Sequence, residues 1–360
     1  MKNYLKRHGV WFAFLVLAVI IGGLSHGDLF SPRNISNLLR QISVNGILAS
    51  GMTVVILTSG IDLSVGSVLA LCGVLVGISQ FYWGWSNLGV QGAAYSLAWG
   101  IFAGMILGTI NGALISIIRV APFVITLGMM VIARGMGLIF SNGSGISPMS
   151  DSLVNASQSY LGASFYVPVF VALVLSVLWR SRRNLADSAF PLLALGTAFY
   201  AFWFYQGFPT ICVFLLVVVG GVYLLLQKTP FGRGVYAIGS NEQAAVWAGV
   251  SVRKIKWMVY VLMGSLAGLA GALVTARQNG ASPTAGELAE LDAIAAVVIG
   301  GTSLKGGSGQ VIGSLVGALI IGLLNIGMDL LGVTSFYQMV FKGFIIIVAV
   351  GLDRAQRDEV

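Results

Sequence analysis

Long apolar runs recur along the whole 360-residue chain, and several of them match the length of a membrane crossing. A helix needs roughly 17 to 25 apolar residues to cross a hydrocarbon core about 30 Å thick. In lipid every backbone group must find its hydrogen-bond partner inside the protein, which uninterrupted runs of this length achieve as helices. The sequence therefore predicts an all-α, polytopic transmembrane helical bundle that forms one domain over residues 1–360. The runs expected to cross are 10–24, 38–59, 63–81, 95–118, 122–140, 165–179, 189–205, 209–226, 257–276, 288–304, 311–328 and 336–352.

Charged residues are sparse and lie mainly between these runs, at 9% of the chain against roughly 25% in soluble domains. With a cytoplasmic N-terminus, the outer loops carry only Arg33, Arg40 and Arg277, as the positive-inside rule favours. This bias requires an even number of crossings, so the weak run 288–304 is counted. We expect about 10–12 crossings and two cytoplasmic termini. The net charge of +8 forms no basic stripe, so no nucleic-acid partner is expected.

Two apolar runs are interrupted by glycine and polar residues where a straight helix would continue. Residues 54–60 lead through 63–66 into a glycine-rich helix, and residues 297–302 lead through 305–307 into another. This weak internal repeat predicts two broken helices, whose free backbone groups are tolerated only inside protein or beside a water-filled cavity. The candidates for the translocation path or the broken helices are Asp62, Ser64, Gly66, Glu290, Asp292, Gly300 and Gly301.

Ionisable residues within the runs are costly in a membrane and are therefore functional candidates. For Asp62 and Asp292 three roles remain open: lining a polar path, capping a broken helix, or pairing with a cation. Asp62 stands in a good N-cap position, so capping is as well supported as contact with a substrate. Arg134 and Lys342 each lie inside a run, and we expect each to pair with a carboxylate.

Glycine is abundant, with 48 residues, and it is patterned. Gly100, Gly104, Gly108 and Gly112 recur every fourth residue, and residues 309, 313 and 317 repeat the spacing. Small residues at this spacing let helix backbones approach closely in lipid. We expect close packing inside the bundle, with a seam between two copies of the chain as the alternative.

The segment 228–256 is the largest charged part of the chain and is expected in the cytoplasm. Within it, small residues stand beside an acid and one aromatic side chain, a combination that suits docking into a groove of a partner. A helix lying on the membrane surface is the alternative. The docking candidates are Glu242, Ala244, Ala245, Trp247 and Gly249.

The sequence offers no enzyme site. It lacks the phosphate-binding pattern G-x-x-x-x-G-K-[S/T], so any ATP hydrolysis must lie in another chain. The only histidines are His8 and His26, and the two cysteines, Cys72 and Cys212, lie far apart in apolar runs. We therefore expect a transport subunit rather than an enzyme, with no cofactor, no metal ion and no disulfide.

Four stretches of the chain match a known family in the same order. The most specific is residues 51–67, with the sequence GMTVVILTSGIDLSVGS, and the others are residues 123–128, 231–233 with 236–242, and 290–303. Through these stretches, residues 34–352 resemble the permease subunits of the ribose, xylose, arabinose and galactose family of ATP-binding-cassette importers.

The resemblance implies a bacterial inner-membrane permease that moves a monosaccharide from periplasm to cytoplasm. It also implies a second permease copy in a homodimer, a separate cassette ATPase, a periplasmic sugar-binding protein and surrounding membrane lipid. Segment 242–249 resembles the coupling pattern E-A-A-x3-G, but it is one residue longer between the acid and the glycine. The extra pair of runs at 165–205, joined by a basic turn at 180–183, resembles xylose-type permeases, so xylose or a related pentose or hexose is expected.

Two other classes remain open on the sequence alone. An ion-coupled secondary sugar transporter would use no ATPase, and its uptake would collapse with a proton uncoupler. A structural or assembly protein of the membrane would give no sugar flux with any partner.

Overall fold

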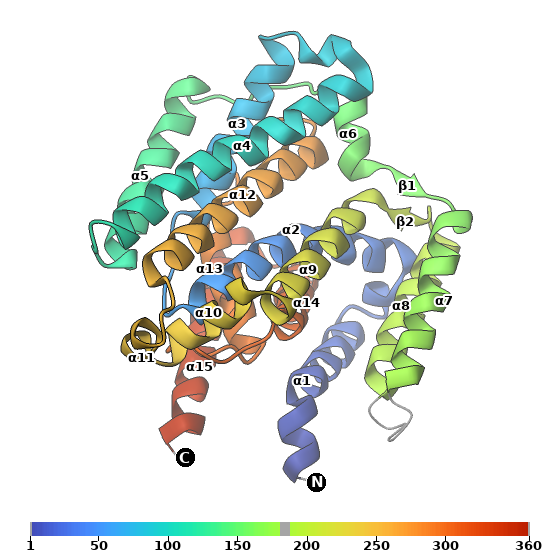
Figure 1. Cartoon of the computed structure of the whole chain (residues 1–360). Helices are drawn as coiled ribbons and strands as arrows, with labels where there is room; N and C mark the ends of the chain where they lie inside the picture. Colours follow the sequence, from blue (N-terminus) through green and yellow to red (C-terminus); the bar gives the residue numbers. More distant parts are fainter. Residues whose placement is uncertain (1, 181–187, 359–360) are drawn as a thin grey trace.

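The computed structural model describes residues 2–180 and 188–358, and in this part the chain is almost entirely helical (Figure 1). The predicted basic turn at 180–183 falls mostly outside the described residues. The helices are α1 (Lys2–Leu24), α2 (Pro32–Leu57), α3 (Val65–Phe81), α4 (Gly89–Ser116), α5 (Pro122–Phe140), α6 (Asp151–Gln158), α7 (Ala163–Arg180), α8 (Ala189–Phe204), α9 (Thr210–Lys228), α10 (Pro230–Ser240), α11 (Glu242–Trp247), α12 (Val252–Gln278), α13 (Ala289–Ile299), α14 (Val311–Leu330) and α15 (Ser335–Asp358).

Two short 3-10 turns, η1 (Asp28–Phe30) and η2 (Trp85–Leu88), and one antiparallel pair of two-residue strands complete the elements. The strands are β1 (Tyr160–Leu161) and β2 (Phe208–Pro209). Among the described residues, six helices are long and apolar enough to cross a membrane, and four further apolar helices are shorter. The predicted all-α, polytopic bundle is confirmed.

Helices α2 and α12 form the centre of the bundle, and α3, α4, α13 and α14 pack around them. From Ile42 to Leu57 nearly every residue of α2 is buried. By contrast α5 exposes most of its apolar side chains, as expected for a helix that faces lipid or another protein. The hairpin of α7 and α8 lies at one edge of the bundle, where α8 packs against α2 (Figure 1).

The glycine stripe of α4 packs against a second small-residue stripe on α12. A Cβ atom at Gly104 would overlap the carbonyl oxygen of Gly264, and one at Gly108 would overlap that of Tyr260. The contact is reciprocal, because a Cβ at Gly264 would overlap the carbonyl oxygen of Gly104. The stripe therefore brings two helices of one chain together, and the expected close packing inside the bundle is confirmed.

The start of α1 and the end of α15 lie at the same end of the bundle as α10 and α11 (Figure 1). This agrees with the even number of crossings that the charge pattern required. That this end faces the cytoplasm stays a prediction from the positive-inside rule.

Candidate functional site

Between α12 and α13 the described chain passes through part of the bundle without forming a helix. Near one end of α3, Gly77 faces Ala281: a Cβ atom added at Gly77 would lie 2.8 Å from the Cβ of Ala281. Near the other end of α3, Gly66 contacts Gly286. The spacing of eleven residues between Gly66 and Gly77 corresponds to about 16 Å of helix, at about 1.5 Å per residue. Irregular backbone thus runs alongside a transmembrane helix, which a membrane tolerates only within protein or beside water.

This position corrects the predicted second interruption. Residues 300–310, including Gly300 and Gly301, form the turn that joins α13 to α14, and the true break precedes Ala289. Gly286 has φ +67° and Leu288 φ +62°, and Pro283 lacks the N–H that a helix would need. These three residues keep the backbone between α12 and α13 out of the helical conformation until α13 begins at Ala289. The first interruption is where the sequence placed it, at residues 58–64 before α3.

The two helices that follow the interruptions, α3 and α13, begin next to each other inside the bundle. A Cβ atom at Gly66, in the first turn of α3, would overlap both the carbonyl oxygen of Gly286 and the carboxylate of Glu290. Only glycine lets these segments meet, so the structure brings the predicted residues Gly66 and Glu290 together. Half-helix N-termini that meet in this way are typical of transporter sites.

Asp62 lies beside this meeting point and is 3% exposed. Its Oδ1 accepts hydrogen bonds from the backbone N–H of Ser64 at 2.9 Å and from the Ser64 hydroxyl at 2.6 Å. Asn111 of α4 donates its Nδ2 to the same hydroxyl at 3.1 Å. In the part of the chain that the structure describes, Asp62 has no cationic partner. The observed role is therefore to satisfy the backbone at the start of α3.

Two buried oxygens in this neighbourhood lack a hydrogen-bond partner among the described residues, Asn111 Oδ1 and the Tyr260 hydroxyl. Sequence reasoning missed both residues. Asn111 stands between Ile110 and Gly112 of the glycine-rich helix, and a lone amide in such a run is the signal that was available.

We expect Asp62→Asn to keep near wild-type stability, because an amide oxygen still accepts both hydrogen bonds from Ser64. Asp62→Ala should lower the free energy of unfolding by about 1–2 kcal/mol, since it leaves buried donors unpaired. Thermal melting of the purified protein in detergent measures the difference. An Asn variant as unstable as the Ala variant would show that the carboxylate charge itself is required.

The two cations inside the bundle are satisfied in different ways. Lys342 of α15 pairs with Asp292 of α13 at 3.0 Å, as expected. Arg134 of α5 instead donates to the backbone carbonyls of Pro283 and Ala285, at 2.6 Å and 3.0 Å, and its charge acts on the Glu290 carboxylate without the direct ion pair that was expected. The reason is the unpredicted break, whose carbonyl groups are free of helical bonds.

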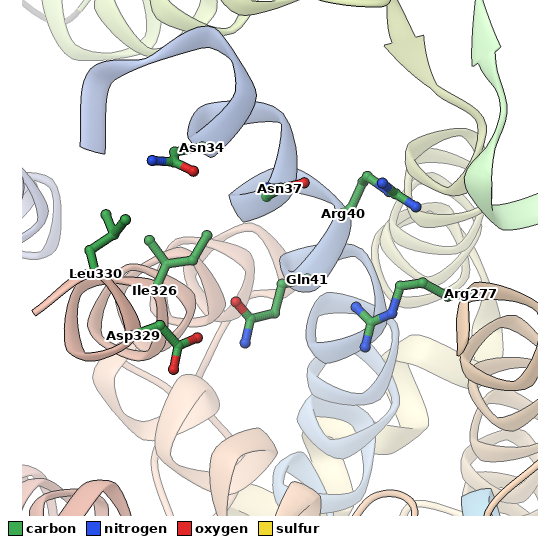
Figure 2. A pocket seen from close by; sticks show the side chains of 8 residues that line it. All are labelled: Asn34, Asn37, Arg40, Gln41, Arg277, Ile326, Asp329 and Leu330. Atoms are coloured by element: carbon green, nitrogen blue, oxygen red, sulfur yellow. The ribbon is translucent and has the colours of Figure 1, made fainter. Parts of the chain in front are cut away.

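A polar cavity of about 470 Å³ opens at the end of the bundle where α2 begins and α12 and α14 end (Figure 2). It is formed by the first turns of α2 and the last turns of α12 and α14. Ser31 starts α2 by accepting from the Asn34 N–H, with Pro32 in the first turn. The lining residues are Asn34, Asn37, Arg40, Gln41, Arg277, Ile326, Asp329 and Leu330. Apart from the two arginines, named only as outer charges, sequence reasoning missed this group, although residues 34, 37 and 41 share one face of a helix.

At the other end, the predicted cytoplasmic segment touches both the first interruption, after Leu57, and the turn that joins α13 to α14. The Gly307 N–H donates to the carbonyl of Leu57, the last residue of α2, at 3.0 Å. Ser59 donates its hydroxyl to the Lys305 carbonyl at 2.7 Å. Helix α10 closes on this junction, because a Cβ at Gly239 would overlap both the Leu57 carbonyl oxygen and the Gly307 nitrogen.

Tyr236 of α10 adds a further bond from the same side, from its hydroxyl to the Gly309 carbonyl at 3.0 Å. Partial burial raises the pKa of this phenol, so it remains a neutral donor. We name residues 57–59, 236–240 and 305–309 the inner junction.

Helix α11 and the turn after it expose four of the five predicted docking residues, and Ala245 is the exception. Ala245 is 3% exposed and packs against Ile238 and Val252, so it holds the α10–α11 hairpin together and is not a docking surface. Trp247 is 84% exposed, and Ala244 is exposed too. Glu242 pairs with Lys256 of α12 at 2.7 Å, and Gly249 turns the chain with φ +79°.

A large basic groove lies beside this hairpin, with a volume of about 1240 Å³. The turn between α4 and α5, with Arg119, forms one wall, and α11 with the start of α12 forms the other. Arg253 and Lys254 add positive charge, while Trp247 offers an apolar anchor. Such a groove and anchor suit a partner protein on this side of the membrane.

Broken helices that meet at mid-bundle, polar openings and an exposed hairpin define a membrane transport protein of the permease class. Comparison with known proteins gives the family: residues 34–350 match the family described as the permease component of the branched-chain amino acid transport system. The chain belongs to this permease family.

Its relatives include sugar permeases that align over nearly their whole length. The ribose import permease protein of Bacillus subtilis is 43% identical over 95% of this chain and 91% of its own. The ribose import permease protein of Escherichia coli is 38% identical, over 99% and 96%. The xylose transport system permease protein of Haemophilus influenzae is 38% identical, over 97% and 96%. No solved structure matches the chain.

Proposed function

We propose that the chain is the membrane-spanning subunit of an ATP-binding-cassette importer that moves a monosaccharide from the periplasm to the cytoplasm. The observation that carries the proposal is the inner junction, where α10 contacts both the end of α2 at the first interruption and the turn that joins α13 to α14. A partner ATPase that moves the hairpin would thereby move the ends of α2, α13 and α14 together. Names of relatives supply the sugar class.

Ribose and xylose are both candidates for the sugar. The expectation of xylose rested on the extra helix pair, now α7 and α8. Sequence identity does not favour xylose over ribose, because the ribose permeases are at least as similar to this chain as the xylose permeases. The ion-coupled transporter receives no support from these relatives. We therefore place the chain in the bacterial inner membrane, with its termini and the α10–α11 hairpin in the cytoplasm.

The proposal includes a separate cassette ATPase, a periplasmic sugar-binding protein and a second copy of the permease. The irregular segment between α12 and α13 supports a second copy of the chain. Thr284 and Glu287 are exposed there, and exposed irregular backbone does not face lipid. A homodimer would cover this segment and enclose the polar path between the two chains.

Trp247→Ala is expected to weaken capture of the ATPase by about tenfold or more and to reduce ATP-dependent sugar uptake to match. An exposed aromatic anchor at the centre of a docking surface typically contributes 2 kcal/mol or more, or roughly a factor of 30. Co-purification of the ATPase and uptake of ribose and xylose into proteoliposomes measure the two effects.

Trp203→Ala is the matched control, because Trp203 of α8 is also exposed but lies away from the hairpin. Uptake by the wild type should survive a proton uncoupler while ATP is held constant. Full ATPase binding by Trp247→Ala would remove α11 as the docking element, and uptake that follows the proton gradient would favour the ion-coupled class.

A further inference from the structure

We propose that the polar cavity between α2, α12 and α14 is a monosaccharide-binding subsite, where the permease first receives the sugar. This inference rests on the proposed function and adds a ligand site to it. The cavity volume of about 470 Å³ falls within the roughly 300–1,000 Å³ of small-molecule sites.

The lining side chains have unused hydrogen-bonding capacity. In the described part of the chain, the side chains of Asn37, Gln41 and Arg277 make no hydrogen bond to other protein groups. Figure 2 shows Gln41 and Asp329 pointing toward each other across the opening, with Arg277 reaching in from α12. Amides both donate and accept, guanidinium groups donate and carboxylates accept, which is the mixture that adjacent sugar hydroxyls require.

The balance of charge favours a neutral ligand over an anion. Arg40 points away from the centre of the cavity and donates to the Tyr160 hydroxyl at 3.3 Å, with its guanidinium 5.8 Å from the centre of that ring. The charged residues of the lining are Arg40, Arg277 and Asp329, and the engagement of Arg40 with Tyr160 leaves Arg277 and Asp329 as the charged groups available to a ligand. Asp329 is held in place by Gln338, which donates to its Oδ1 at 2.8 Å.

Ile326 and Leu330 give the cavity an apolar side, against which the C–H face of a sugar ring can lie. Further polar side chains lie deeper in the bundle, along α14. One turn below Asp329, buried Asn325 has an Oδ1 without a partner among the described residues. With Asp292 and Lys342 it lines a space of about 10 Å³, enough for about one water molecule.

The test uses the complete transporter, reconstituted with its ATPase and its binding protein, and labelled ribose and xylose as probes. Gln41→Leu and Asn37→Leu keep approximate side-chain size and remove the hydrogen bonds. We expect each to lower the number of sugar molecules imported per ATP by about tenfold, with docking of the loaded binding protein unchanged. Gln278→Leu, next to Arg277 but outside the lining, should keep the wild-type ratio.

A second measurement is independent of ATP: labelled sugar should bind saturably to the purified wild-type permease and lose that binding in Gln41→Leu. Unchanged binding and unchanged ratio in both variants would overturn the subsite. Loss of binding-protein docking, with sugar binding intact, would also overturn it and would make the cavity a contact for that protein. Absence of ATP-driven uptake in the wild type would instead refute the proposed function, and sugar binding would still decide the subsite.

Discussion

Gly239→Ala is expected to uncouple ATP hydrolysis from sugar uptake and to lower uptake by at least about tenfold. The added methyl group would occupy the same space as the Leu57 carbonyl oxygen and the Gly307 nitrogen, so α10 must move away from the inner junction. The exposed surface of α11 is unchanged, and the ATPase should still bind. Uptake and ATP hydrolysis are measured on the same proteoliposomes, with and without sugar-loaded binding protein.

Gly221→Ala on α9 is the matched control, because a Cβ there meets no atom within 4 Å. Tyr236→Phe tests whether a loss of coupling comes from the inner junction or from a general folding defect, because it removes only the hydrogen bond to Gly309. It should reduce the sugar-to-ATP ratio in the same direction but by a smaller factor. Wild-type coupling in both Gly239→Ala and Tyr236→Phe would mean that force reaches the bundle by another route.

Much of the fold was readable from the sequence because a membrane imposes a single solution on a long apolar run. The start of α5 at Pro122 and its end at Phe140 coincide with the predicted run. The glycine stripe of α4 predicted close packing, since only small residues permit it. Which helix fills that space was not readable, because the partner stripe of α12 lies some 150 residues further along the chain.

The candidate site was predictable only in part, for a physical reason. Asp62 and Ser64 stand together because their bonds are local, two residues apart. The second break was misplaced because glycines at 300–307 signal a turn as readily as an interrupted helix, and only tertiary contacts with Gly66 reveal the true one. Ala245 was misread for the same reason, because its burial depends on Ile238 and Val252 folding over it.

Gly108→Leu is expected to cause the largest loss of stability of any substitution proposed for this protein. A Cβ at this position already overlaps the Tyr260 carbonyl oxygen and lies 3.1 Å from the Gly264 Cα, so the larger side chain must push α4 and α12 apart. Overpacking in a core typically costs 1–3 kcal/mol, and backbone that cannot yield raises this to roughly 3 kcal/mol or more. Melting temperature and the yield of monodisperse protein in detergent measure the loss.

The matched control is Gly128→Leu on α5, where a Cβ would meet no atom within 4 Å. Because the stripe packs within one chain, the loss at Gly108 should appear whether the detergent-solubilised protein is monomeric or dimeric. The disturbance should also extend to the segment before α3, because the Tyr260 hydroxyl packs against Gly60. A Cβ atom added at Gly60 would lie 2.6 Å from that hydroxyl. If Gly108→Leu melts at the same temperature as Gly128→Leu, the α4–α12 contact does not determine stability, and the glycine stripe must serve a contact outside the chain.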